Sequence, residues 1–212
     1  MTTFATIAAV SYLLGSIPFG YILMRLFRGQ DVRQTGSGNI GATNVARSSP
    51  GLGLATLALD AGKGWLAVTL SPVFCPHPLQ RPGPVDLCMA LAALGALAGH
   101  IFPIWLKFRG GKGVATAAGS FAVLAPDAML AAFGAFLLMV MLFRYVSLGS
   151  MVGVAVFPVA AYLLHRHALP TSAYALMGIG SALIIGRHHA NIRRLLAGTE
   201  SRLRFRRSKE SA

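Results

Sequence analysis

The residues best suited to chemistry lie in short polar segments between long apolar runs. The first segment, residues 35–47, packs Gly, Ser, Thr and Asn together. Its glycines let the backbone bend tightly, so that hydroxyl, amide and N–H donors can point to one place. Donors beside a cation suit a phosphate or a developing oxyanion, although an ordinary polar loop is the alternative. The candidate site residues here are Ser37, Thr43, Asn44 and Arg47.

A glycine-rich turn, residues 110–113, opens directly into an apolar run and reads Gly110, Gly111, Lys112, Gly113. The exposed N–H groups of a helix N-terminus, its dipole and Lys112 together form an anion cradle. The spacing is not that of a Walker A motif, and no Ser or Thr follows Lys112 to hold Mg²⁺. We therefore expect phosphate binding without nucleotide hydrolysis. His100, upstream of the turn, is equally compatible with a structural and a functional role.

Two charged residues, Asp60 and Lys63, interrupt an apolar run. They could form a neutralising ion pair, but ionisable residues inside a membrane are costly and usually line a cavity. The functional interpretation is favoured, with Lys63 reaching an anion at the cytoplasmic face.

The last apolar run ends in a basic segment that contains His188, Asn191 and Arg194, followed by Glu200. The spacing of Asn191 and Arg194 places them on one helix face, which suits a second phosphate clamp. The alternative is a basic collar attracted to anionic lipid. Ser147, near another end of an apolar run, is a further candidate.

The elements that must position these residues are membrane helices. The chain has 212 residues and is 55% hydrophobic but only 12% charged, half the usual share for a soluble domain. Its mean hydropathy is +0.63. The net charge is +13, with basic residues confined to breaks between apolar runs and to the tail. That distribution indicates membrane topology and excludes nucleic-acid binding, because no basic face is interleaved with aromatic residues.

The apolar runs that we interpret as membrane helices are 4–26, 52–74, 87–106, 114–143, 147–164 and 171–185. Basic residues gather on one side only if 114–143 crosses twice or enters and returns, with Pro126 at the turn. We predict an all-α membrane bundle of about seven transmembrane helices, the one before Pro126 short or re-entrant. The N-terminus lies outside and the C-terminus in the cytoplasm. Residues 1–200 form one integral membrane domain, and 201–212 form a basic cytoplasmic tail.

The remaining side chains offer no metal site and no covalent nucleophile. Cys75 and Cys88 flank one short connection, where two small buried residues are the favoured interpretation and a disulfide the alternative. Neither a metal-binding Cys or His spacing nor a nucleophile with an adjacent base is present.

Four motifs together resemble the bacterial acyl-phosphate:glycerol-3-phosphate acyltransferases, the PlsY family. The matching segments are residues 37–44, 60–64, 99–116 and 191–200, so the resemblance runs from the first helix to Glu200. It implies transfer of a fatty acyl group from acyl phosphate to the 1-hydroxyl of glycerol 3-phosphate, giving lysophosphatidate and inorganic phosphate. The site residues it implies are Ser37, Thr43, Asn44, Arg47, Lys63, Gly110, Gly111, Lys112, Gly113, Ser147, His188, Asn191, Arg194 and Glu200.

This resemblance sets further expectations about mechanism and setting. Ser37, Asn44 and His188 are expected to be catalytic, and the others to bind substrate, with no metal or cofactor. We expect direct attack by the glycerol hydroxyl, whose proton passes to a substrate phosphate oxygen or to His188. The expected setting is phospholipid biosynthesis at the bacterial inner membrane, with the site facing the cytoplasm, membrane lipid around the protein and the acyl-phosphate-producing enzyme PlsX as a partner.

Two other function classes compete with this interpretation. A transporter of a phosphorylated metabolite would also need intramembrane charges, but its site should lie near the midplane of the membrane. A membrane-anchoring subunit that binds acidic lipid would explain the tail but not residues 37–44 or the 110–113 turn.

Overall fold

The computed structural model describes residues 2–75, 84–165 and 169–203, and among these it contains helices but no β-strand. Most of the expected basic tail, residues 204–212, lies outside the described residues. In chain order the elements are α1 (Thr2–Ser16), α2 (Phe19–Arg28), η1 (Val32–Gln34), α3 (Ala42–Ser48), α4 (Pro50–Phe74), α5 (Pro84–Ile101), η2 (Ile104–Leu106), α6 (Val114–Leu124), α7 (Pro126–Phe143), α8 (Val146–His165), α9 (Thr171–Arg187) and α10 (His189–Leu196).

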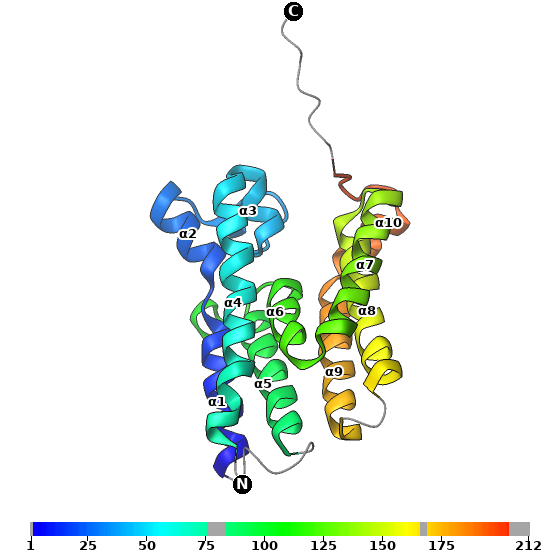
Figure 1. Cartoon of the computed structure of the whole chain (residues 1–212). Coiled ribbons are helices and arrows are strands. Elements are labelled where there is room, and N and C mark those ends of the chain that lie inside the picture. The colour runs from blue at the N-terminus through cyan, green and yellow to red at the C-terminus, as the bar shows by residue number, and fades with distance from the viewer. Residues whose placement is uncertain (1, 76–83, 166–168, 204–212) are drawn as a thin grey trace, which may run out of the picture.

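The helices form an upright bundle with two distinct ends (Figure 1). Helices α1, α4, α5 and α6 stand on one side, and α7, α8 and α9 on the other. The short helices α2, α3 and α10 gather at one end, which we call the loop end. We call the opposite end, where α4 and α8 finish, the far end.

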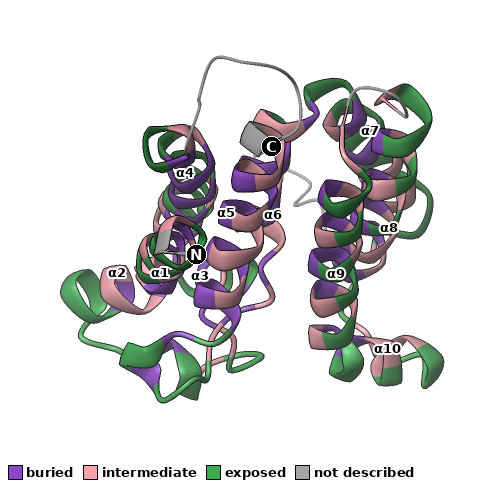
Figure 2. Ribbon diagram, turned by 90° about the horizontal axis from the view of Figure 1, so that it is seen from below, coloured by how far each residue is buried: buried purple, intermediate pink, exposed green. Residues whose placement is uncertain are grey.

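The outer surface of the bundle suits lipid. Four described segments are long and apolar enough to cross a membrane. They are Thr3–Arg28, Asp86–Leu106, Pro126–Phe143 and Val146–His165. Large apolar side chains are exposed on α7 and α8, and the exposed positions lie on their outward faces (Figure 2). The number of crossings and the orientation of the termini remain predictions.

The first apolar run is not one helix, as the sequence suggested, but two. Helix α1 ends at Ser16 and α2 begins at Phe19. Pro18 between them has no backbone N–H to continue the helical ladder, so the chain changes direction there. The expected break in residues 114–143 is confirmed, because α6 ends at Leu124 and α7 starts with Pro126. Proline is favoured at the first position of a helix, where its missing N–H is not needed.

Small residues allow the inner helices to touch backbone to backbone. A Cβ at Gly15 of α1 would collide with the Ala96 carbonyl of α5, and one at Gly119 of α6 with the Ala61 carbonyl of α4. In lipid, such close approach supplies the van der Waals contact that holds helices together. The small residues in the apolar runs therefore serve packing.

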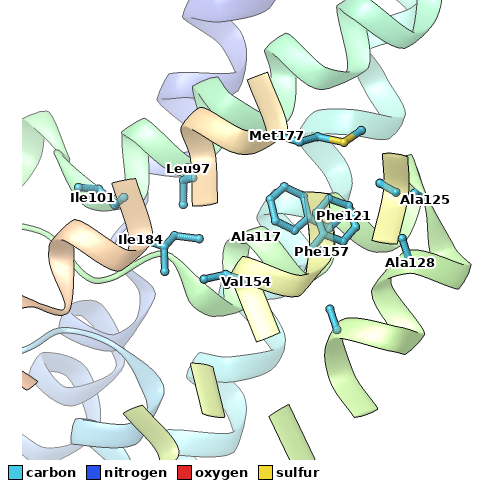
Figure 3. Close-up of a cluster of buried hydrophobic side chains, with 12 residues drawn as sticks. Leu97, Ile101, Ala117, Phe121, Ala125, Ala128, Val154, Phe157, Met177 and Ile184 are labelled. Carbon is cyan, nitrogen blue, oxygen red and sulfur yellow. The ribbon is translucent and has the colours of Figure 1, made fainter. Parts of the chain in front are cut away.

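A buried apolar cluster joins the two sides of the bundle (Figure 3). Leu97 of α5 and Phe121 of α6 contribute from one side, and Phe157 of α8 and Ile184 of α9 from the other. The rings of Phe121 and Phe157 are stacked, with centroids 3.9 Å apart. This cluster fixes α9, and hence the residues that follow it, relative to α6.

A disulfide between Cys75 and Cys88 ties the end of α4 to the start of α5 at the far end. Both cysteines are buried, as the favoured interpretation required, but their sulfur atoms are bonded rather than merely packed. The sequence alone could not decide this, because pairing depends on the separation of the two helix ends, whose Cα atoms lie 6.3 Å apart.

Candidate active site

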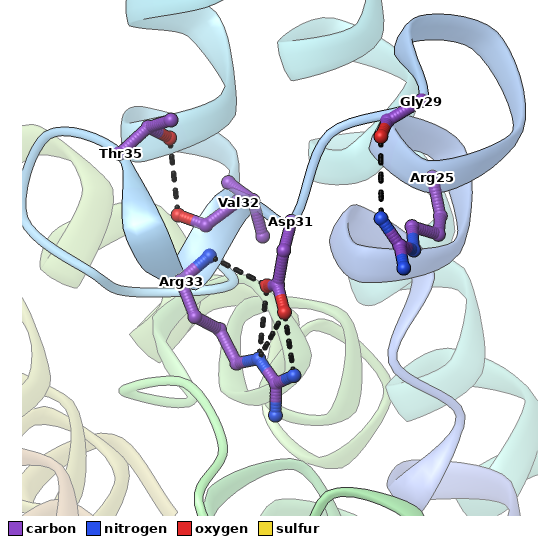
Figure 4. Close-up of polar contacts among 6 residues, drawn as sticks. All are labelled: Arg25, Gly29, Asp31, Val32, Arg33 and Thr35. Carbon is purple, nitrogen blue, oxygen red and sulfur yellow. Dashed lines mark hydrogen bonds and ion pairs between the residues drawn. The ribbon is translucent and has the colours of Figure 1, made fainter.

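The loop between α2 and α3 is held by its own charged residues (Figure 4). Asp31 accepts hydrogen bonds from the Arg33 backbone and guanidinium, the shortest of them 2.6 Å. These bonds to Arg33 lower the pKa of Asp31 to about 2. Arg25 donates to the carbonyl of Gly29, whose left-handed backbone (φ 64°) ends α2. The charges of this segment therefore stabilise the loop.

Asn44, at the start of α3, organises the polar segment around it. It is buried, and its Oδ1 accepts the Ser37 N–H at 2.9 Å. Its side-chain amide donates to the carbonyls of Val32, Thr35 and Asn39 at 3.1, 3.0 and 2.9 Å. Since both ends of the amide are engaged, these contacts favour a positioning role for Asn44 over the direct catalytic role expected from the sequence.

The remaining candidates of this segment stay accessible. Ser37, Thr43 and Arg47 are exposed, and the Ser37 hydroxyl has no hydrogen bond to a described residue. Gly36 has φ 54°, and a Cβ there would lie 3.4 Å from Nη1 of Arg47 and would collide with Asn44. Glycine is required at this position, and it lets the Arg47 guanidinium lie directly against the loop.

The base of the 110–113 turn is paired with the end of α5. The N–H of Gly110 donates to the Ile101 carbonyl at 3.1 Å, and that of Gly111 donates to the His100 carbonyl at 3.0 Å. A Cβ on Gly110 would collide with the same carbonyls. These two N–H groups are therefore used within the protein and are not the anion donors that the sequence suggested.

The N–H groups that follow are the ones left for a ligand. Those of Lys112 and Gly113 make no hydrogen bond to any described residue. Gly113 has φ 87° and immediately precedes Val114, the first residue of α6. Unbonded N–H groups, the N-terminal end of a helix and a lysine together can hold a phosphate oxygen.

The carboxylate of Glu200 is hydrogen-bonded to the other candidate residues of the C-terminal segment and to Ser147. Glu200 accepts hydrogen bonds from Ser147 at the start of α8, from Asn191 of α10 and from Nε of Arg194, at 2.7, 2.7 and 2.6 Å. Burial alone would raise the pKa of Glu200, but these three hydrogen bonds outweigh it and leave that pKa below its usual value. The expected grouping of these four residues is present, with Glu200 as its acceptor.

Cations from distant parts of the chain converge on Lys112. The pKa of Lys112 is lowered to about 8, with burial as the largest cause. The charge of Glu200 opposes this shift, while those of Arg194, Arg47 and Arg187 add to it. The polar loop, the glycine turn and the C-terminal segment therefore meet at the loop end, where positive charge exceeds negative charge.

His188, between α9 and α10, is buried beside this cluster. The pKa of His188 is lowered to about 4, mainly by burial and to a smaller extent by the charge of Lys112. A bond to the Ile184 carbonyl, at 2.8 Å, opposes the shift. Because a carbonyl only accepts, Nδ1 carries the proton in the neutral ring and Nε2 keeps a lone pair. In the neutral ring, Nε2 of His188 is therefore the nitrogen that is free to accept a hydrogen bond.

Lys63 is held by contacts within the protein. Its Nζ donates to the Ile17 carbonyl at 2.7 Å and pairs with Asp60 at 2.8 Å. The ion-pair interpretation, which the sequence analysis ranked second, therefore describes Lys63 in this structure.

Arg187 belongs to the cluster of cations, although it is not among the site residues predicted from the sequence. Its guanidinium donates to the Gly110 carbonyl at 3.5 Å and lies over the Phe102 ring, 5.8 Å from the centroid. Its position directly before His188, in a basic segment already chosen, was the available signal. No metal-binding group of three or more His, Cys, Asp or Glu occurs among the described residues.

We compared the chain with known protein families and solved structures. The family model described as glycerol-3-phosphate acyltransferase matches residues 5–198. A glycerol-3-phosphate acyltransferase from Syntrophotalea carbinolica is 45% identical and aligns with 96% of this chain and 100% of its own. Another, from Anaeromyxobacter sp. strain Fw109-5, is 46% identical and aligns with 93% of this chain and 95% of its own.

The solved structures of PlsY, an integral membrane glycerol 3-phosphate acyltransferase, share the fold. Its glycerol 3-phosphate form superposes with a TM-score of 0.85 at 33% identity, covering 95% of this chain and 96% of that one. Its lysophosphatidic acid form gives 0.82 at 32% identity, covering 95% of each chain. The expected all-α, multi-pass membrane architecture is confirmed. The chain belongs to the glycerol-3-phosphate acyltransferase family of integral membrane proteins.

Proposed function

We propose that this protein transfers a fatty acyl group from acyl phosphate to the 1-hydroxyl of glycerol 3-phosphate. The products are lysophosphatidate and inorganic phosphate, at the entry to phospholipid biosynthesis. The observation that carries the proposal is the set of charges around Lys112, in which Arg47, Arg187 and Arg194 outnumber a single carboxylate, Glu200, that is itself bonded to Arg194. Both proposed substrates bear phosphate, and a surplus of cations is what two phosphates require.

The forms of the related PlsY structures agree with the acceptor and the product. One contains glycerol 3-phosphate and the other lysophosphatidic acid. Because this chain shares their fold over nearly its whole length, we transfer that acceptor and that product to it.

An acyl phosphate donor makes a covalent acyl-enzyme unnecessary. The donor is already activated, so the enzyme must align the reactants and stabilise the oxyanion. The glycerol oxygen attacks the acyl carbon, and the bond from that carbon to the phosphate oxygen breaks. Phosphate leaves with the electron pair. The free N–H groups of Lys112 and Gly113 are the proposed donors to substrate phosphate, and the exposed hydroxyl of Ser37 is the proposed donor to developing negative charge.

The proton of the attacking hydroxyl has two proposed acceptors. Nε2 of neutral His188 is one, because its Nδ1 proton is bonded to Ile184. A substrate phosphate oxygen is the other, since a phosphate dianion is itself a base near neutral pH. Lys112, beside His188, would stabilise negative charge on the phosphate in either case.

We place the site at the cytoplasmic face of the bacterial inner membrane. Glycerol 3-phosphate is soluble, whereas the acyl chain prefers lipid, and an interfacial site admits both. The disulfide at the far end supports this orientation, because disulfides persist in oxidising compartments. An enzyme that makes acyl phosphate, PlsX, is the expected supplier of the donor.

The direct test is a turnover assay with defined donors. Purified full-length protein is incubated with glycerol 3-phosphate and either acyl phosphate or acyl-CoA, and inorganic phosphate and lysophosphatidate are measured. We expect equal amounts of both products from acyl phosphate and none from acyl-CoA. Product from acyl-CoA alone would reject the donor. A labelled acyl-enzyme trapped with acyl phosphate in the absence of acceptor would reject direct attack.

A further inference from the structure

A buried polar cluster lies behind the glycine turn and takes no part in the proposed reaction. Asp60 and Lys63 of α4 and His100 of α5 are 2%, 5% and 3% exposed. Oδ1 of Asp60 is 2.8 Å from Nζ of Lys63 and 3.5 Å from Nδ1 of His100. Burying such groups in a membrane bundle is costly, so their presence calls for a function.

The two ends of this cluster touch the two segments that build the candidate active site. At one end, Nζ of Lys63 donates to the carbonyl of Ile17, at the break between α1 and α2. At the other end, the His100 ring lies against Gly111 so closely that a Cβ there would collide with Nε2. The Gly111 N–H also donates to the His100 carbonyl at 3.0 Å. The contacts therefore run from that break to the glycine turn.

The position of the His100 ring determines where the glycine turn can sit. Glycine at position 111 leaves the ring in direct contact with the backbone of the turn. The ring has a carboxylate on its Nδ1 side, and that carboxylate is fixed by a lysine anchored elsewhere. The next N–H groups in the chain, those of Lys112 and Gly113, are the ones free to meet phosphate.

We propose that Asp60, fixed by Lys63, holds the His100 ring against Gly111 and thereby positions the 110–113 turn for substrate phosphate. In this proposal, which rests on the proposed function, Asp60, Lys63 and His100 are positioning residues and touch no substrate. A misplacement of the turn weakens every phosphate contact made through it, even though no substrate ligand has been removed.

The first test replaces His100 with leucine and measures steady-state kinetics for both substrates on the purified full-length protein. We expect His100→Leu to raise KM for glycerol 3-phosphate about tenfold and to change kcat and KM for acyl phosphate less than about twofold. Lys112→Ala, which alters the same turn directly, should likewise raise KM for glycerol 3-phosphate more than it changes kcat or KM for acyl phosphate. A uniform fall in kcat without a selective change in KM would overturn the proposal.

A matched control exists elsewhere in the bundle. His165 of α8 pairs with Asp127 of α7 at 2.6 Å, which is again a histidine against a carboxylate. His165→Leu should leave both KM values at the wild-type level. An equal change in KM from His165→Leu would show a general loss of packing and would reject the assignment. Inactive wild-type and His165→Leu proteins would instead reject the proposed function.

A second variant separates positioning from simple charge neutralisation. Asp60→Leu combined with Lys63→Met removes both charges together, because a single change would leave one buried charge unpaired. If the pair only neutralises itself, the folded double variant keeps its wild-type KM. Our proposal predicts that KM for glycerol 3-phosphate rises as in His100→Leu, because the ring has lost its carboxylate. A wild-type KM in the double variant would contradict it.

Discussion

Both ends of the bundle contain charged side chains, but the ratio of positive to negative charge differs between them. At the loop end, the charges that act on Lys112 are three arginines, Arg47, Arg187 and Arg194, and one carboxylate, Glu200. Towards the far end, Asp127 pairs one to one with His165. A one-to-one pair needs nothing further, whereas an excess of cations favours an anion from outside. The difference shows that unbalanced charge, rather than polarity as such, marks the candidate active site.

The largest expected effect tests this difference directly. Lys112→Ala or Arg194→Ala removes a charge-assisted partner of a phosphate, so we expect kcat/KM for glycerol 3-phosphate to fall about 10- to 100-fold. This kcat/KM is measured from initial rates of phosphate release over a range of glycerol 3-phosphate concentrations. Asp127→Asn, which changes a balanced pair, is the control and should stay near the wild-type value. Equal losses in all three variants would remove the distinction between the two ends.

A second prediction concerns stability and tests the close helix packing in the interior of the bundle. Gly119→Ala places a methyl group against the Ala61 carbonyl, so it should destabilise the fold by about 1–3 kcal/mol. A lower midpoint of thermal unfolding in detergent would show this. Gly178→Ala on α9 has open space around the new methyl group and is the matched control. If both substitutions leave the midpoint unchanged, close contact between α4 and α6 is not a source of stability.

A smaller effect is expected in the pH dependence of KM for glycerol 3-phosphate. The pKa of Lys112 is about 8, so the free enzyme loses this positive charge as the pH rises through that value. Glycerol 3-phosphate binding then weakens, and we expect its KM to rise up to about tenfold between pH 7 and pH 9. Arginine stays charged over this range, and Lys112→Arg should flatten the profile. A profile that kept its slope in Lys112→Arg would assign the titration to another group.

The sequence predicted the helical membrane architecture and the segments that form the site, because glycine, proline and charge interrupt apolar runs in a local pattern. It did not predict what individual side chains contact. Asn44 binds the backbone carbonyls of the loop that precedes it, and Lys63 donates to the Ile17 carbonyl at the break between α1 and α2. Both contacts depend on how the chain folds back on itself, which the local sequence pattern does not encode. The split at Pro18 was missed for a different reason, because the apolar composition continues through it.

The most direct test of the central claim, that separate polar segments form one phosphate site, is a double-mutant cycle. Arg47→Ala, Lys112→Ala and the double variant are compared by kcat/KM for glycerol 3-phosphate. Residues that serve the same phosphate should be coupled, so we predict a non-additive term of about 1 kcal/mol or more. Strictly additive losses would mean that the polar loop and the glycine turn act separately, and would contradict the account.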